Sequence, residues 1–216
     1  SQHNNHLLSE AAGLLTAGLA LPELKESTRW RELGWKWLNR GLQKQIDGYG
    51  EYSQHSCNYH RLMLQVVLWA HALARENRLG WSFKTREALR RAVHWMLSLL
   101  DDGTGRVPNL GANDGAYIFP LSSCPFEDQR PVLHAAARVF LGYDLPAGPW
   151  DEMALWLGAG KEGRDSLSMP RYLGDHIYGK QSWAYLRTAQ YDAHPSHADQ
   201  LHLDLWWRRL NLTPHA

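Results

Sequence analysis

The sequence has few features that would place the chain in a specialised class of protein. Its two cysteines, Cys57 and Cys124, are too few for a disulfide scaffold, and we expect both thiols to be free. The longest apolar runs, such as residues 66–70, are far shorter than the roughly 20 residues of a transmembrane helix. Lysine and arginine total 23 against 22 for aspartate and glutamate, so no net charge attracts nucleic acid or an anionic membrane. We therefore expect neither as a partner, and an anionic ligand must be held by locally placed side chains.

Tryptophan, in contrast, is abundant, with 11 residues among 216. Apolar residues make up 44% of the chain, enough for a globular core that buries roughly 70% of the unfolded surface. Tryptophan side chains bury large areas and also stack on flat apolar faces. We expect most of them in the core and the remainder to be available as platforms for sugar rings.

Up to about residue 157 the apolar residues recur with the period of an α-helix. Glycine and proline interrupt this pattern, and Ser27 and Ser82 are suitable N-cap residues for two of the helices. The helix-turn-helix spacing of roughly 25 to 30 residues is typical of stacked antiparallel hairpins. The predicted helices cover residues 5–21, 27–46, 58–75, 83–100, 130–141 and 150–157.

After residue 158 the pattern changes to a period of two, around residues 183–188 and 201–206, which predicts two strands. Two strands do not form a stable sheet alone, so we expect them to begin a β-domain that further chain or a partner completes. The predicted fold class is mainly α. The predicted domains are a helical domain over residues 1–160, a linker over 161–178 and the start of the β-domain over 179–216.

A long loop over residues 104–126 separates the fourth and fifth predicted helices. It is rich in glycine and proline, but it carries too many apolar residues to be disordered. Loops of this length in a compact domain are usually functional. Its polar candidates are Asn113, Asp114 and Tyr117, and the alternative is that they satisfy the hydrogen bonds of turns.

Three polar clusters contain the candidate catalytic residues. The first, Asn58, Tyr59 and His60, comes directly before the apolar run of a buried helix, where a phenol and an imidazole are plausible groups for acid/base chemistry. The alternative is an ordinary half-buried tyrosine beside a surface histidine. The other two clusters are residues 4–6 (NNH) near the start and residues 197–199 (HAD) near the end.

In their order along the sequence, the three clusters resemble those of the heparinase II/III-like polysaccharide lyases, a superfamily that includes heparin, heparan and alginate lyases. The matching pieces are residues 4–7 (NNHL), 49–53 (YGEYS) leading into 58–60 (NYH), the loop 109–120, and 196–201 (SHADQL). The resemblance implies an incomplete α/α toroid of antiparallel helical hairpins, followed by a C-terminal antiparallel β-sandwich, with the active site between them. It also implies a periplasmic or secreted protein. We expect the chain to be a fragment that starts within the toroid, with the missing β-domain or a second copy as a partner.

The implied reaction is β-elimination across the C4–O4 bond of a uronic acid in an anionic polysaccharide. The proton next to a carboxylate is very weakly acidic, so the site must neutralise the carboxylate as well as supply a base. The resemblance assigns neutralisation to Asn5 or His6, at the start of a helix where anions are favoured, and proton transfer to Tyr59. An unperturbed tyrosine is about a thousandfold too protonated at pH 7 for base work, so His197 is expected to share the task. Whether Tyr59 or His197 is the base stays open.

Further side chains are expected to contact the substrate or to lie beside a metal. The expected substrate-binding residues are Glu51, His60, Asn113 and Asp114. His197, Asp199 and His202 have a ligand-like spacing, and some relatives hold a metal in the β-domain. We expect no bound metal and no cofactor here, because the remaining ligands of a divalent ion would lie beyond the chain end.

Two other functions are consistent with the same residues. A glycoside hydrolase on a similar toroid needs two carboxylates about 5 to 10 Å apart, and the spacing of Asp114, Glu51 and Asp128 does not support such a pair. A non-catalytic glycan-binding fragment would keep the tryptophan-rich cleft alone. The near-neutral net charge favours alginate or a bacterial exopolysaccharide over a heavily sulfated glycan.

Overall fold

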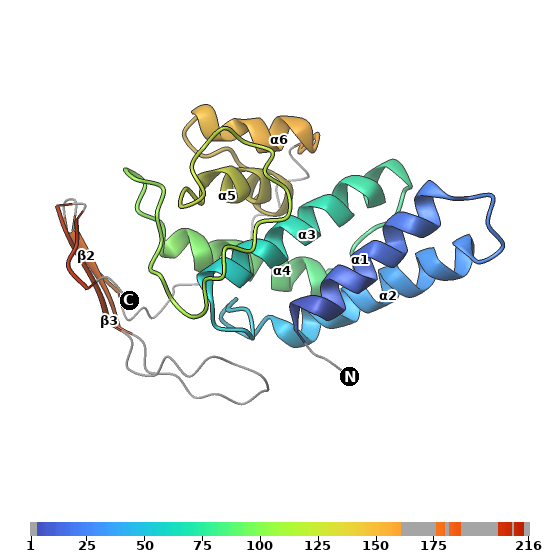
Figure 1. Cartoon of the computed structure of the whole chain (residues 1–216), viewed down its shortest axis with the longest axis horizontal. Helices are drawn as coiled ribbons and strands as arrows, with labels where there is room; N and C mark the ends of the chain where they lie inside the picture. The colour runs from blue at the N-terminus through green and yellow to red at the C-terminus, as the bar shows by residue number, and fades with distance from the viewer. Residues whose placement is uncertain (1–3, 161–175, 180–181, 187–202, 209, 214–216) are drawn as a thin grey trace.

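The structure is a computed structural model that describes residues 4–160, 176–179, 182–186, 203–208 and 210–213. It is mainly helical, and all six predicted helices are confirmed (Figure 1). A π-helix over Ala137–Leu141 continues α5, and a 3₁₀ turn over Pro149–Asp151 precedes α6. The α-helices are α1 (Asn5–Ala20), α2 (Ser27–Gln45), α3 (Cys57–Glu76), α4 (Phe83–Ser98), α5 (Arg130–Ala136) and α6 (Glu152–Trp156).

Helices α1 and α2 form a tight antiparallel hairpin because glycines lie where their backbones meet. A Cβ atom added to Gly18 would lie 2.5 Å from the Arg31 nitrogen, and one added to Gly34 would lie 2.5 Å from the Leu15 nitrogen. Only glycine permits this approach, since real Cβ atoms do not come so close to backbone atoms. The first predicted hairpin of the helical domain is therefore present in the structure.

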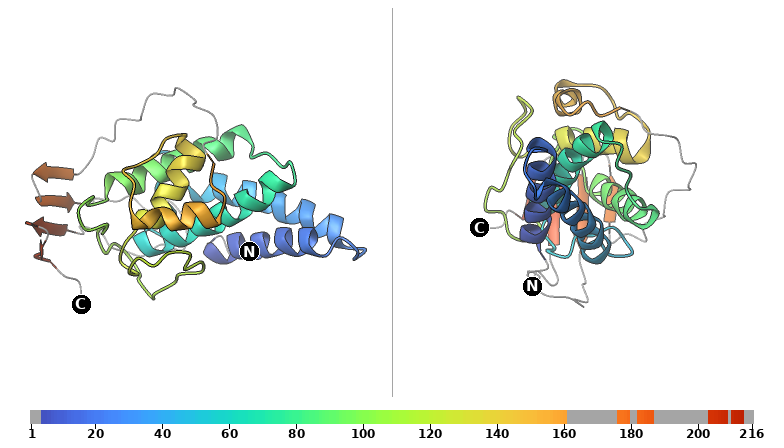
Figure 2. Two further views of the ribbon diagram at one scale, coloured as in Figure 1. Left: turned by 90° about the horizontal axis from the view of Figure 1, so that it is seen from above. Right: turned by 90° about the vertical axis from the view of Figure 1, so that its right-hand side faces the viewer.

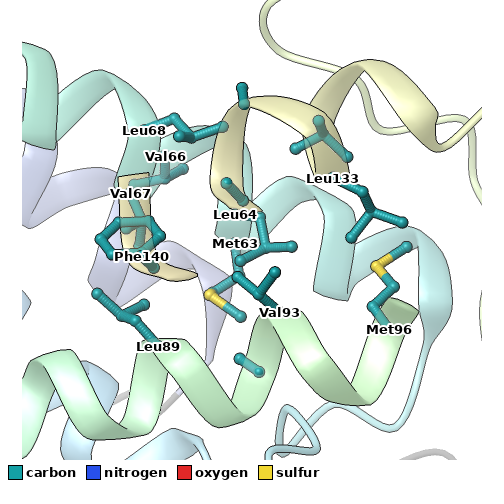
Figure 3. Packing of buried hydrophobic residues seen from close by; sticks show 14 of the residues in the cluster. Met63, Leu64, Val66, Val67, Leu68, Leu89, Val93, Met96, Leu133 and Phe140 are labelled. Atoms are coloured by element: carbon teal, nitrogen blue, oxygen red, sulfur yellow. The ribbon is translucent and has the colours of Figure 1, made fainter. Parts of the chain in front are cut away.

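Helix α3 is the central helix of the core. Its side chains are buried around most of its circumference, which is typical of a helix enclosed by others. It contacts α1, α4 and α5, and Figures 2 and 3 show neighbouring helices on several of its sides. Figure 3 shows Met63, Leu64 and Val67 packed against residues of α4 and of the α5 region: Leu89, Val93, Met96, Leu133 and Phe140. The start of α3, where the first polar cluster lies, is thus fixed by the core.

The two predicted N-caps have different outcomes. Ser82 caps α4 as predicted, because its side chain accepts a hydrogen bond from the Thr85 nitrogen. The prediction for Ser27 was wrong. Ser27 is the first residue of α2 and its hydroxyl donates to the Pro22 carbonyl oxygen at 3.3 Å, while Glu26 occupies the N-cap position without a side-chain bond.

The described strands form one antiparallel sheet in the order β1-β2-β3-β4, at the end of the molecule where α3 begins (Figures 1 and 2). The two predicted strands are confirmed as β2 (Ser182–Leu186) and β3 (Leu203–Trp207), which pair with Trp183 opposite Trp206. The expectation of only two strands was wrong, because β1 (His176–Gly179) and β4 (Leu210–Asn211) pair on either side of them. The strand β1 begins within the segment predicted as a linker. Among the described helices, none is both long and apolar enough to cross a membrane.

Candidate active site

The first turn of α3 is tied to the long loop by its N-cap residue, Ser56. The Ser56 hydroxyl accepts a hydrogen bond from the Tyr59 nitrogen at 3.1 Å and donates one to the Ala112 carbonyl oxygen at 2.6 Å. The Cys57 nitrogen donates to the Leu110 carbonyl oxygen at 3.0 Å. These bonds fix the loop over the positive end of the helix dipole, where polar and anionic groups are favoured.

Asp114 of this loop holds two side chains of the first polar cluster. The Tyr59 hydroxyl donates to Asp114 Oδ2 at 2.6 Å, and Asn58 Nδ2 donates to Asp114 Oδ1 at 3.3 Å. The loop itself supports the carboxylate, because the Ala116 nitrogen also donates to Oδ1 at 3.1 Å. Three of the residues singled out in the sequence are therefore brought together from positions more than fifty residues apart.

This contact makes Tyr59 harder to deprotonate. The hydrogen bond to the Asp114 carboxylate raises the pKa of Tyr59 above its ordinary value, and partial burial and the negative charge of Asp114 raise it further. Tyr59 is therefore a neutral phenol at neutral pH in this structure. A neutral phenol is a proton donor, and it acts as a base only after losing its proton.

Arg61 contacts Asn58 and is almost completely buried, with 1% of its surface exposed. Its guanidinium donates to Asn58 Oδ1 at 2.8 Å and to the Phe126 carbonyl oxygen, and it stacks over the rings of Phe126 and Tyr117. Burial lowers the pKa of Arg61 to about 10, so the side chain stays a cation at neutral pH. Because Asn58 Oδ1 accepts from Arg61, the amide nitrogen of Asn58 is turned toward Asp114.

A cavity of about 290 Å³ is lined by Asn58 and Asn113, the sequence neighbours of Tyr59 and Asp114. Arg61 also lines it from α3, Arg106 lines it from the long loop, and Trp206 lines it from β3. Trp206 is buried, with 4% of its surface exposed. The cavity therefore lies where the helices meet the sheet, and its lining includes two guanidinium groups, four amides and the carboxylate of Glu127. Sequence reasoning did not assign Arg106 or Trp206 to a site, since neither lies in a recognisable motif.

The first residues of α1 lie near the same region. Asn4 caps α1 by accepting from the His6 nitrogen at 3.1 Å, and the Asn5 nitrogen donates to Gln54 Oε1 at 3.2 Å. Gln54 comes two residues before Ser56, so this bond joins the start of α1 to the segment that enters α3. The side chain of Asn5 is half-buried and that of His6 is exposed. Figures 1 and 2 show α1 and α3 running in the same direction, so both helix starts face one end of the molecule.

The other residues predicted to bind substrate, to transfer a proton or to lie beside a metal differ in their exposure to solvent, and some lie outside the described residues. Asn113 is exposed and its amide donates to Asn109 Oδ1 at 3.0 Å. Glu51 is mostly buried, and its carboxylate lies 2.9 Å from His55 Nδ1. His197 lies outside the described residues, as do Asp199 and His202. In the described part of the chain, no group of three or more His, Cys, Asp or Glu residues has the geometry of a metal site.

His60 is enclosed in the core and cannot contact a glycan in this structure. It has no exposed surface, its Nε2 lies 3.0 Å from the Ala92 carbonyl oxygen, and its ring stacks on Trp95 at 4.8 Å. Burial lowers the pKa of His60 to about 3, so the imidazole is neutral. The substrate-binding role expected for His60 from the sequence therefore does not fit this structure. On a helix, the residue after Tyr59 points about 100° away from it, and here that direction is the core.

Comparisons with known proteins find relatives of the helical part of the chain. Residues 1–103 match the family model described as Heparinase II/III N-terminus. The chain is 35% identical over 83 residues to a heparin-sulfate lyase of Pedobacter heparinus, a match covering 38% of this chain and 13% of that protein. It is 33% identical over 131 residues to a heparin-sulfate lyase of Bacteroides thetaiotaomicron, covering 60% of this chain and 18% of that protein. No solved structure matches.

The match includes the starts of both α1 and α3, so the two polar clusters of the helical domain lie within the matched residues. Over residues 1–103 the chain is therefore similar to the heparinase II/III family, and its curated relatives are named heparin-sulfate lyase. It spans less than a fifth of the length of the curated relatives that it matches.

Proposed function

We propose that this chain is part of a polysaccharide lyase that cleaves a uronic-acid-containing glycan by β-elimination. The observation that carries the proposal is the hydrogen bond by which Asp114 holds the Tyr59 phenol at the start of α3, in a chain whose curated relatives are named heparin-sulfate lyase. We further propose that the helical hairpins of residues 1–160 form part of an α/α toroid. The sheet would then begin a β-sandwich, and the protein would be periplasmic or secreted.

The names of the relatives favour a sulfated glycan of the heparan type as the substrate. This differs from the expectation of alginate, which rested on the near-neutral net charge. The net charge of a whole chain does not predict its substrate when cations are concentrated at one site. Arg61 and Arg106 line one cavity with a single carboxylate, that of Glu127, so the cavity has a local excess of positive charge that favours carboxylate and sulfate groups.

In the proposed elimination, a base removes the C5 proton, the electrons of that bond form the C4=C5 double bond, and the C4–O4 bond breaks. The departing O4 takes up a proton and becomes the hydroxyl of the released sugar. Negative charge accumulates on the uronate carboxylate during this step, so a donor to that carboxylate is required. The half-buried amide of Asn5, at the positive end of α1, is the proposed donor, with exposed His6 beside it.

The hydrogen bond between Tyr59 and Asp114 supports one division of the proton transfers. A tyrosine is protonated at neutral pH and the contact with Asp114 keeps Tyr59 so, which leaves the phenol available to protonate O4 when its hydrogen turns from Asp114 to the leaving oxygen. The C5 proton then goes to another base, and His197 is the proposed group, since an unperturbed imidazole titrates near neutral pH. Asp114, expected from the sequence to bind substrate, is proposed instead to orient Tyr59.

Ultraviolet absorbance tests the proposal, because only elimination creates a double bond conjugated to the carboxylate. The chain is incubated with heparan sulfate, heparin, alginate and hyaluronan, with a Tyr59→Phe variant as the matched control. We expect absorbance to rise with heparan sulfate and to stay flat with the control. If no glycan gives a rise while circular dichroism shows a folded chain, the chain does not perform the elimination, and the proposal fails.

The contacts of Asp128 argue against the hydrolase alternative. Both oxygens of Asp128 accept hydrogen bonds from the Arg130 guanidinium, at 2.7 to 3.2 Å, and the residue is buried. A carboxylate held in this way is not available as the partner of Asp114 across a sugar ring. Release of new reducing ends without a rise in absorbance would be the result expected of a hydrolase.

A further inference from the structure

A second groove lies between α1 and α2, away from the Tyr59 and Asp114 pair. Its volume is about 220 Å³. Leu7 lines it from α1, and Trp37, Arg40, Gly41, Gln43 and Lys44 line it from α2. Trp37 is exposed over 37% of its surface, which is unusual for so large an apolar side chain.

Gly41 lets α1 and α2 pack closely at the groove. A Cβ atom at Gly41 would lie 2.8 Å from Leu8 Cδ2 and 3.5 Å from Leu7 Cδ2. Leu7 gives the groove an apolar floor next to the indole of Trp37. A flat aromatic ring beside such a floor accommodates the apolar face of a sugar ring.

The rim of the groove is positively charged. The sequence of α2 contains five cations, Arg29, Arg31, Lys36, Arg40 and Lys44, against one acidic residue, Glu32. Arg40 and Lys44 are four residues apart, a spacing at which like charges repel on a helix. Within the described ranges, no carboxylate lies within ion-pair distance of either of these two side chains, and the Arg40 guanidinium carbon lies 5.9 Å from the centroid of the Trp37 ring. A bound anion would relieve this repulsion.

We propose that the groove formed by Leu7, Trp37, Arg40, Gly41 and Lys44 is a second binding site for an anionic polysaccharide. A sugar ring stacks on Trp37, and its carboxylate or sulfate groups pair with Arg40 and Lys44. The identity of the ligand rests on the proposed function, whereas the groove and its charge do not. Leu7 directly follows His6, so the groove adjoins the start of α1, where the uronate carboxylate is proposed to bind. One long glycan chain can therefore occupy both sites, whereas a short oligosaccharide occupies the first alone.

The test is the affinity for heparan sulfate, measured by titration calorimetry in a Tyr59→Phe background so that the glycan stays intact. Lys44→Gln and Trp37→Ala remove groove residues. Lys36→Gln is the matched control for charge, since Lys36 is exposed on the same helix outside the groove. Trp156→Ala is the matched control for tryptophan, since Trp156 is exposed on α6. Arg40→Gln provides a second charge variant if Lys44→Gln folds poorly.

Each groove variant is expected to weaken the binding of long chains by about threefold to tenfold, the range for an exposed ion pair or an aromatic contact. The two controls should stay within about twofold, and a heparan tetrasaccharide should bind all variants alike. Equal losses in Lys44→Gln and Lys36→Gln would mean that only the general charge of α2 matters, and would overturn the proposal. No loss in any groove variant would also overturn it. A groove-dependent affinity without any unsaturated product would refute the proposed lyase activity and leave the binding site standing.

Discussion

The neutral imidazole of His60 links the stability of the helical core to pH. Burial lowers the pKa of His60 to about 3, and the hydrogen bond with the Ala92 carbonyl oxygen only partly opposes this effect. In the unfolded chain the pKa of a histidine is near 6.5. Below that value the unfolded state binds a proton that the folded state does not, so the free energy of unfolding decreases as the pH falls from about 6.5 toward 3.

The size of this effect follows from the same shift. At about pH 4.5, roughly two units below 6.5, His60 alone removes about 3 kcal/mol, because each unit is worth about 1.36 kcal/mol. For a chain of this size that loss lowers Tm by about 6 to 12 °C. Urea unfolding at neutral pH and at about pH 4.5 measures it, with His60→Gln as the comparison. Glutamine keeps a donor for the Ala92 carbonyl oxygen and has no titrating group.

The comparison isolates His60 from the other histidines. Burial also lowers the pKa values of His94 and His134, but these two residues are present in both proteins and their effects cancel. We expect His60→Gln to lose about 3 kcal/mol less than the wild type between the two pH values. A His6→Gln control, at an exposed histidine, should follow the wild type. If wild type and His60→Gln lose stability in parallel, His60 is not buried as a neutral ring and the reasoning is refuted.

Four further predictions concern the hairpin, the first turn of α3 and the long loop. Gly34→Ala should destabilise the chain by about 1 to 3 kcal/mol, because the new methyl group meets the α1 backbone. Gly13→Ala, with no atom within 4 Å of the added Cβ, should instead stabilise it by up to about 1 kcal/mol in thermal unfolding. Ser56→Ala should cost about 1 kcal/mol in urea unfolding through loss of the N-cap; an unchanged midpoint would contradict this role. Asp114→Asn should lower the pKa of Tyr59, seen as earlier phenolate absorbance in an alkaline titration after subtraction of a Tyr59→Phe titration.

The helices could be predicted from the sequence because each is specified by local pattern. The apolar residues of α3 continue around the whole helix, which indicates a helix enclosed by others. The same pattern implies that polar residues within α3 are buried as well, and the burial of His60 follows from it. The short strands β1 and β4 could not be predicted, because four and two residues are too few to display a period of two.

The candidate site could be predicted only in part. The motif residues Asn58 and Tyr59 were recognisable from their order in the chain, but their contact with Asp114 depends on the conformation of a long loop. Loop conformation follows from specific hydrogen bonds, such as that of Ser56 with the Ala112 carbonyl oxygen, and these leave no periodic signal. The wall formed by Trp206 depends on how the sheet packs against the helices, which no local pattern encodes.

The most direct test of the proposed chemistry is the initial rate of unsaturated product formation from heparan sulfate by the wild type and by Tyr59→Phe. The variant removes one oxygen and leaves the ring in place, so binding and folding should be preserved. If the Tyr59 phenol protonates the leaving oxygen, the rate should fall by about a hundredfold or more, with little change in affinity. A Tyr59→Phe variant that forms the unsaturated product at the wild-type rate would contradict the account.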